Sequence, residues 1–302
     1  MPSNAPPYSA LLCAFFSAVL MATIGVFSKL TGLPAEIITF FRLFLGAAFM
    51  GAFAAATGAG SSLKGWPCAA VLINGAFLAG FIIFYVQAMN HTTMANAIML
   101  IYLAPPVASV VAHFFMGERL TPLSVSLILL ALLGFGMMME FNIEISSKSR
   151  EFIGVGLGLA AMTCYAGFIL NNRLISASVH VYNRTFYAML AGACLMLPWA
   201  AGSFSTIGTD EIPWLFGIGL FPGFLAILLA VVALSRLSAA TFGTIAYTEP
   251  VAVVVFGWTL FGQHLNTMQA AGCALIIISG IAKTLLSTTE SGDAGALTDR
   301  SC

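Results

Sequence analysis

The sequence predicts an all-α integral membrane protein of ten transmembrane helices, arranged as two inverted repeats of five helices (5+5). Three observations support this fold class. The chain of 302 residues is 60% hydrophobic and only 7% charged, with a mean hydropathy of +1.00, and only lipid accepts so apolar an exterior. Apolar runs of helix length follow one another almost without a break. A Tyr-x-x-Pro signal, Tyr102 to Pro105, recurs 145 residues later as Tyr247 to Pro250.

The lengths of the apolar runs define the individual spans, because a helix needs roughly 20 apolar residues to cross a bilayer. The predicted spans are 8–30, 36–57, 67–88, 93–116, 122–141, 153–174, 182–201, 213–235, 239–261 and 267–287. They divide the chain into a first five-helix repeat, residues 8–141, and a second, residues 153–287. Residues 288–302 are rich in Ser, Thr, Gly and Asp, and we expect a flexible C-terminal tail there.

The two repeats share a sequence register. The further matching pairs in the same register are Ala95 with Ala240, Val110 with Val255, Gly117 with Gly262, Leu120 with Leu265 and Leu130 with Leu275. Arg42 and Arg184 also take equivalent places, near the starts of the second and seventh spans. Because five is odd, the second repeat enters the membrane from the opposite side. Two related halves of this kind usually carry a solute across the bilayer at a site between them.

The distribution of basic residues favours an orientation with both termini in the cytoplasm. In that orientation the inner side carries Lys64, Arg119, Arg173, Arg184, Arg236, Lys283 and Arg300, and the outer side carries Lys29, Arg42, Lys148 and Arg150. The formal net charge is zero, from 11 basic and 11 acidic residues, so nothing indicates nucleic-acid binding. The six cysteines form no close pair, and we expect neither disulfides nor a metal site.

The chain resembles the drug/metabolite transporter superfamily in its EamA-type branch, over about residues 8–287. The resemblance rests on the 5+5 plan, on the helix breaks at Pro105 and Pro250, on Gly117-Glu118 after the fourth helix and on its imperfect copy Gly262-Gln263. The chain is most similar to bacterial inner-membrane exporters of aromatic and other neutral amino acids. The resemblance implies a multi-pass inner-membrane transporter of a small molecule such as an amino acid, with no enzymatic activity and no cofactor.

Three prolines are candidates for helix breaks or gates: Pro105, Pro106 and Pro250. Proline inside a helix lacks an N–H donor and leaves a carbonyl without its partner. Lipid tolerates that loss only where protein or a watery cavity satisfies the backbone. We expect the fourth and ninth helices to be broken at mid-membrane and to line the substrate path. Simple packing kinks are the alternative, since proline is common in transmembrane helices.

Polar and aromatic side chains close to these breaks are the candidates for substrate binding. They are Tyr85, Met99, Tyr102, Tyr165, Thr244, Tyr247 and Trp258. Tyrosine and tryptophan rings present an apolar wall with a polar tip, which suits an aromatic or medium-sized apolar side chain. The alternative is that these rings fill space between helices or form an interfacial belt.

Glu249, His113 and Arg42 are the candidates for a charge or proton role. Glu249 is the acidic residue that lies well inside a predicted span, where an ionisable group is costly and marks function. It is a candidate to bind a substrate amine, to move a proton or to pair with a cation, and the alternative is a protonated structural carboxyl. Glu249 and Tyr247 differ by about 200° around an ideal helix, so both face one cavity only if Pro250 unwinds the turn. His113 is either a pH switch or a satisfied histidine, and Arg42 meets a carboxylate or extends to the interface.

These residues predict a secondary transporter that exports amino acids by alternating access. No Walker A motif is present, so we do not expect ATP to drive it directly. Export of other small metabolites or drugs is the nearest alternative. An intramembrane enzyme and a channel remain as more distant ones, although we find neither a catalytic dyad nor the ring of polar groups common in channels.

Overall fold

The computed structural model is helical throughout its transmembrane part. It describes residues 7–63, 65–89, 91–92, 94–118, 120–141, 149–176, 178–262, 264 and 266–298. Within these residues, seven helices are long and apolar enough to cross a membrane, and two shorter apolar helices accompany them. Together with α8 they make up the ten spans. Six residues used in the sequence arguments lie outside the described part: Lys64, Arg119, Lys148, Gln263, Leu265 and Arg300.

The helices divide into two sets of five spans. The first set is α1 (Pro7–Thr31), α2 (Ala35–Ala56), α3 (Ala69–Met89), the pair α4 (Met94–Ile101) and α5 (Ala104–Met116), and α6 (Pro122–Met138). The second set is α7 (Ser149–Leu174), α8 (Val181–Ala201), the run of α9 (Ile212–Ile218), η3 (Gly219–Leu225) and α10 (Ala226–Leu234), the pair α11 (Ala239–Ala246) and α12 (Thr248–Phe261), and α13 (Thr267–Thr298). Short 3₁₀ turns, η1 (Ala59–Leu63) and η2 (Phe204–Thr206), follow α2 and α8.

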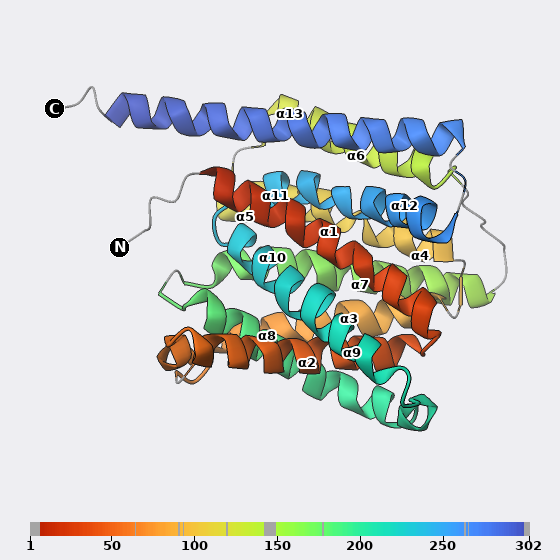
Figure 1. The fold of residues 1–302 in the computed structure, drawn as a ribbon. Helices are drawn as coiled ribbons and strands as arrows, with labels where there is room; N and C mark the ends of the chain where they lie inside the picture. The colour runs from red at the N-terminus through yellow and green to blue at the C-terminus, as the bar shows by residue number, and fades with distance from the viewer. Residues whose placement is uncertain are drawn as a thin grey trace.

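The two halves interlock instead of folding as separate units. The α3 helix packs against α7 and α8, and the equivalent contacts in the repeat are α10 with α1 and η3 with α2. Three further contacts join equivalent helices of the two halves: α6 with α13, α2 with α8, and α5 with α11. The first of these pairs lies on one side of the bundle and the second on the other (Figure 1). This contact pattern has the approximate two-fold symmetry that a repeated five-helix unit requires.

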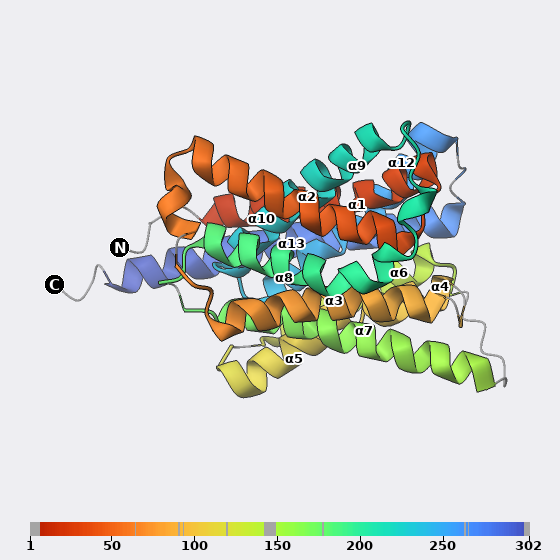
Figure 2. The same cartoon turned by 90° about the horizontal axis from the view of Figure 1, so that it is seen from below.

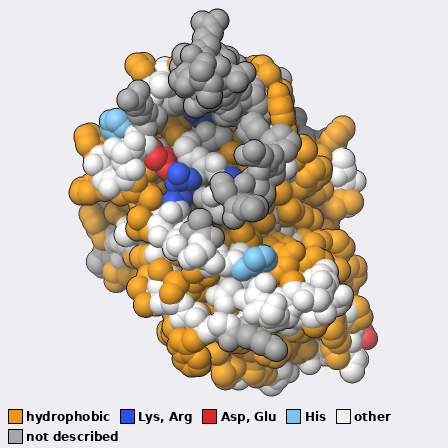
Figure 3. All heavy atoms as spheres, turned by 90° about the vertical axis from the view of Figure 1, so that its left-hand side faces the viewer, with side chains coloured by type: hydrophobic (Ala, Val, Ile, Leu, Met, Phe, Trp, Pro, Cys, Tyr) orange, Lys and Arg blue, Asp and Glu red, His pale blue; other side chains and the backbone are white. Residues whose placement is uncertain are grey.

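Both ends of the described chain lie at the same end of the bundle, as an even number of spans requires (Figure 1). We call this end the termini end. Seen from below, the bundle is elongated, and its long helices run between this end and the opposite one (Figure 2). Hydrophobic side chains surround the termini end (Figure 3), and large apolar side chains such as Phe115 and Leu285 are mostly exposed. Such a surface is stable only against lipid.

The structure differs from the sequence predictions in two spans. The predicted span 213–235 is not a uniform α-helix, because its middle is the π-helix η3, which contains Pro222. Proline lacks the N–H that an α-helical turn would use, and a wider turn relieves the clash with the preceding carbonyl. The last helix continues to Thr298, so the backbone is helical within the segment that composition predicts to be a loose tail.

Candidate functional site

The fourth span is broken at Tyr102 and Leu103, which form a turn between α4 and α5. The break follows from Pro105 and Pro106, which open α5. Pro106 has no N–H with which to reach the carbonyl one turn earlier, that of Tyr102. The Tyr247 hydroxyl, from the other half of the protein, donates to this carbonyl oxygen at 2.5 Å. A backbone group left without a partner by a proline is therefore satisfied across the interface between the halves.

The ninth span is broken at the equivalent place, where α11 ends at Ala246 and α12 begins at Thr248. Pro250 lies in the first turn of α12 and is buried. The two breaks pack directly against each other: a Cβ atom added to Gly243 would lie 2.6 Å from the Cβ of Pro105. Glycine is needed at this position because α11 and α5 approach so closely. The breaks predicted in both halves are thus present, and they meet between the two repeats.

Arg42 of α2 and Glu249 of α12 lie within electrostatic range of each other in the interior of the bundle. Arg42 also donates from Nε to the carbonyl oxygen of Pro222 at 3.0 Å, and its Nη2 lies 2.6 Å from the Met21 sulfur. Two of these partners, Pro222 and Met21, were not predicted as site residues. A proline within an apolar run was the signal for Pro222, as it was for Pro105 and Pro250. Of the two alternatives for Arg42, extension to the interface does not describe this structure, because the guanidinium points inward to these groups.

Three tyrosines complete this charged centre. Tyr102 is a hydrogen-bond partner of the Glu249 carboxyl, and Tyr85 and Tyr165 lie within electrostatic range of it. The Phe81 ring lies between the last two, with centroids 4.9 Å from Tyr165 and 6.4 Å from Tyr85. We call Arg42, Tyr85, Tyr102, Tyr165 and Glu249 the central cluster.

The central cluster draws on five spans and on both halves. Its side chains come from α2 and α3, from the break between α4 and α5, from α7 and from α12. All five keep some accessible surface, although Arg42, Tyr102, Tyr165 and Glu249 lie deep inside the protein. A guanidinium, a carboxyl and three phenol groups are therefore held together with accessible surface between the repeats.

Tyr247 lies beside the central cluster, with its ring centroid 5.6 Å from that of Tyr102, but it has no accessible surface. Its side chain packs with the half-buried Met99 against Phe135 and Ile276, in an apolar cluster that also contacts Tyr102. Tyr247 thus acts here as a brace for the Tyr102 carbonyl, and it has no surface left to offer a ligand.

The remaining predicted site residues lie apart from the central cluster. Thr244 is buried, and its hydroxyl donates to the Ala240 carbonyl of its own helix at 2.9 Å. Trp258 is 57% exposed on α12. His113 is exposed, and its Nδ1 lies 2.7 Å from the carbonyl oxygen of Glu118. The structure therefore supports a local structural reading of Thr244 and His113, and it gives Trp258 no contact with the cluster.

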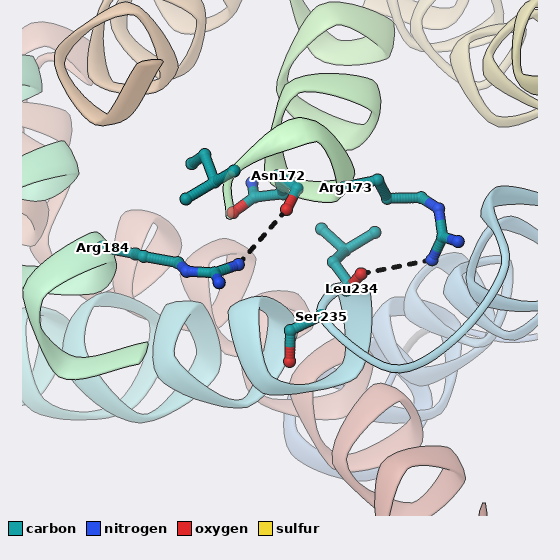
Figure 4. Close-up of a pocket in the computed structure, with 6 residues that line it drawn as sticks. Asn172, Arg173, Arg184, Leu234 and Ser235 are labelled. Atoms are coloured by element: carbon teal, nitrogen blue, oxygen red, sulfur yellow. Dashed lines mark hydrogen bonds between the residues drawn. The ribbon is translucent and has the colours of Figure 1, made fainter. Parts of the chain in front are cut away.

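Two small pockets lie elsewhere in the bundle. The first, of about 160 Å³, is lined by Asn172, Arg173, Ile175, Arg184, Leu234 and Ser235 (Figure 4). Arg184, the counterpart of Arg42, donates to the carbonyls of Ser176 and Val179 after α7 at 2.7 and 2.9 Å, and to that of Asn172 in the last turn of α7 at 3.4 Å. The second, of about 140 Å³, is lined by Glu36, Ile83, Val86, Gln87, Met196 and Trp199. Neither pocket contains a predicted site residue. Among the described residues, no three His, Cys, Asp or Glu side chains are grouped as a metal site would need.

Two interlocked five-helix repeats with a polar centre between them define a membrane transporter of the inverted-repeat class. The chain belongs to the EamA-like transporter family, which it matches over residues 8–139 and again over residues 152–283. The two matches correspond to the two repeats. The predicted resemblance and the fold class are thereby confirmed.

Individual relatives share about a quarter of their residues with this chain. The uncharacterized transporter YxxF of Bacillus subtilis (strain 168) is 26% identical over 92% of this chain and 90% of its own length. The pseudopaline exporter CntI of Pseudomonas aeruginosa (strain UCBPP-PA14) is 28% identical over 94% and 96%. The threonine/homoserine exporter RhtA of Escherichia coli (strain K12) is 24% identical over 73% and 72%. A crystal structure that covers 92% of this chain and 98% of its own superposes with a TM-score of 0.81 at 23% identity, and it shares the fold.

Proposed function

We propose that this transporter exports amino acids, with aromatic and other neutral ones favoured, by alternating access of its two halves. The observation that carries the proposal is the central cluster, in which Arg42 and Glu249 come from opposite halves of the protein and lie together among tyrosines. An amino acid is a zwitterion, and it needs one cationic and one anionic partner. The cluster supplies one of each.

The proposed binding mode follows from the chemistry of these groups. Arg42 accommodates the substrate carboxylate, for which a guanidinium is a well-matched donor. Glu249 accommodates the ammonium group. Tyr85, Tyr102 and Tyr165 form an apolar wall with hydroxyl tips, which suits a neutral or aromatic side chain. When no substrate is present, the Pro222 carbonyl oxygen and the Met21 sulfur hold the Arg42 guanidinium inside the bundle.

The names of two relatives support export as the direction and leave the substrate open. RhtA is a threonine/homoserine exporter, which agrees with a neutral amino acid. CntI, which matches over more of its length, is a pseudopaline exporter, and export of another small metabolite is therefore the second candidate. An anion carrier is less favoured because the central cluster contains one cationic side chain, Arg42, whereas a phosphorylated solute calls for several cations.

We also propose that the protein lies in the bacterial inner membrane with both termini in the cytoplasm. The cationic side chains of Arg173, Arg184 and Arg236 lie at the termini end, where α7, α8 and α10 begin or end. Arg42, which the sequence argument placed with the outer loops, points into the bundle and no longer counts against this orientation. The remaining bias agrees with positive residues on the cytoplasmic side.

Purified protein in liposomes tests the proposal. Vesicles are loaded with a panel of amino acids or a metabolite mixture, and efflux is measured with and without a proton gradient. We expect saturable efflux of neutral amino acids that is stimulated by the same amino acid on the opposite side. Efflux of other metabolites but of no amino acid would favour the second candidate. Non-saturable flux without counter-flow would indicate a channel and contradict alternating access.

A further inference from the structure

One carboxylate at the termini end connects the ends of several spans. Glu118 directly follows α5 and its Gly117 cap, and its Oε2 accepts a hydrogen bond from the backbone N–H of Ala239, the first residue of α11, at 3.0 Å. Its other oxygen forms an ion pair with Nε of Arg173, near the end of α7. Glu118 belongs to the first half, and both of its partners belong to the second.

Arg173 extends the same connection to a further span. Its Nη1 donates to the carbonyl oxygen of Leu234, at the end of α10, at 3.4 Å, and to that of Leu237 in the link to α11. Figure 4 shows this guanidinium turned toward the end of α10. We call Glu118, Arg173 and the backbone groups of Leu234, Leu237 and Ala239 the latch. It joins the ends of the fourth, sixth, eighth and ninth spans.

The latch is partly shielded from water, which strengthens it. The side chains of Arg173 and Glu118 are only 22% and 15% exposed, and an acidic and a basic group touch on this face of the molecule (Figure 3). Hydrogen bonds between ionised groups are stronger than neutral ones, and partial burial reduces their screening by salt. The latch is thus more than a pair of freely solvated surface charges.

The opposite end of the bundle has no such charges at the equivalent positions. In the repeat register Glu118 corresponds to Gln263, a neutral amide, and Arg173 corresponds to Thr31. The Thr31 hydroxyl donates within its own helix, to the Phe27 carbonyl at 2.9 Å. A fully symmetric inverted repeat would close its two ends with equivalent contacts. Here the charged pair is present at the termini end, and neutral residues take the equivalent positions of the other end.

We propose that the latch is the gate that keeps the termini end closed in this conformation, and that Glu118 and Arg173 bias the resting population toward it. Alternating access needs each end to close in turn, and unequal closing contacts shift the balance between the two states. The central cluster agrees with this, since Arg42 and Tyr85 lie in the parts of α2 and α3 that are remote from the termini end. The inference rests on transport by alternating access and not on which solute is carried.

Distances between spin labels at the two ends test the gate without any substrate. In a background in which the six native cysteines are replaced, cysteines at Phe115 and Ser235 report on the termini end. Cysteines at Leu30 and Leu260 report on the opposite end. All four side chains are exposed, so labels do not disturb the core. In Glu118→Ala we expect the ratio of open to closed populations at the termini end to rise about tenfold or more, with the opposite end closing in step.

Two further variants make the test decisive. Glu118→Gln keeps an acceptor for the Ala239 N–H and removes the charge that faces Arg173, so a smaller shift in the same direction is expected even if Glu118→Ala does not fold. Glu140→Ala is the matched control, because Glu140 also joins two spans, through Asn266 and Gln269 at 2.5 and 3.0 Å, but lies at the opposite end. It should leave the termini-end distances unchanged.

The outcomes separate a gate from a static brace. If Glu118→Gln folds and its termini-end distances match those of the unmodified latch, or if the opposite end opens instead, the proposal is wrong. Because the distances are measured without substrate, a protein that opens as expected but transports no amino acid would support the gate and contradict the proposed substrate. Unaltered distances in a protein that transports amino acids normally would contradict the gate and support the proposed substrate.

Discussion

The two helix breaks have nearly the same sequence and different surroundings. Both contain Tyr-x-x-Pro, and both interrupt a span at the tyrosine. In the first break, Tyr102 points its hydroxyl toward the Glu249 carboxyl and offers its carbonyl to Tyr247. In the second break, Tyr247 is fully buried and its hydroxyl is used up by that carbonyl. One tyrosine faces the polar centre, and its counterpart holds the two halves together.

The residue before the proline accounts for this difference. It is Ala104 in the first break and Glu249 in the second. Ala104 is fully buried among apolar groups, whereas Glu249 turns toward Arg42. The repeated residues thus build the shared scaffold of two broken helices, and a single departure from the repeat introduces the charge that the proposed site requires. The charged residue of the proposed site is therefore found where the sequences of the two halves differ.

The largest effect is expected for Glu249→Gln, which makes the second break as neutral as the first. Removing one partner of a desolvated charge pair costs about 2–5 kcal/mol of binding, and each 1.4 kcal/mol is about tenfold. We therefore expect amino-acid efflux from liposomes at subsaturating substrate to fall by about 100-fold, with the protein still folded and helical by circular dichroism.

Glu140→Gln serves as the control for that experiment. Glu140 is exposed just after the end of α6, and surface substitutions usually change stability by no more than about 0.5 kcal/mol. Its efflux should stay near that of the unmodified protein. Undiminished efflux in folded Glu249→Gln would show that Glu249 is not part of the binding site. The proposed site would then lack an anionic partner for the substrate ammonium group.

A pair of tyrosine variants comes next and separates the two roles of the repeated tyrosine. Tyr247→Phe leaves the Tyr102 carbonyl without a donor, which costs about 1–3 kcal/mol when the group is buried. We expect a lower midpoint of thermal unfolding. Tyr102→Phe removes the hydroxyl that faces Glu249 and keeps its backbone carbonyl, so efflux should fall with a smaller change in that midpoint. Equal changes in both properties for both variants would contradict the division of roles.

Gly243→Ala tests the close contact between the breaks and should have a smaller effect. The added methyl group meets the Pro105 ring, and overpacking of this kind costs about 1–3 kcal/mol unless the helices move apart. We expect a lower unfolding midpoint in detergent. Gly156→Ala in α7 is the matched control, because nothing lies within 4 Å of its new methyl group, and alanine is the better helix former. A midpoint lowered equally by both variants would point to a general effect of lost glycine.

The sequence was sufficient for most of the fold and for part of the site. Apolar run lengths and the repeated Tyr-x-x-Pro predicted the spans and the breaks, because lipid burial and missing proline donors act locally along the chain. The direction of each side chain was harder to predict. The Tyr247 hydroxyl is taken up by the Tyr102 carbonyl of the other half, and the π-helical turn around Pro222 supplies a carbonyl to Arg42. Both depend on contacts between distant spans, which helical periodicity alone does not reveal.

The smallest effect is expected at the pair His113 and Trp258, which occupy matching positions in the two halves. The sequence made both of them site candidates, yet His113 is exposed beside the Glu118 carbonyl and Trp258 is 57% exposed on α12. Efflux by Trp258→Ala should therefore remain within about twofold of the unmodified protein, as for other surface changes of about 0.5 kcal/mol. A large loss of efflux without unfolding would mean that Trp258 reaches the substrate path in the alternate conformation. The two breaks would then exchange the roles that they have in this conformation.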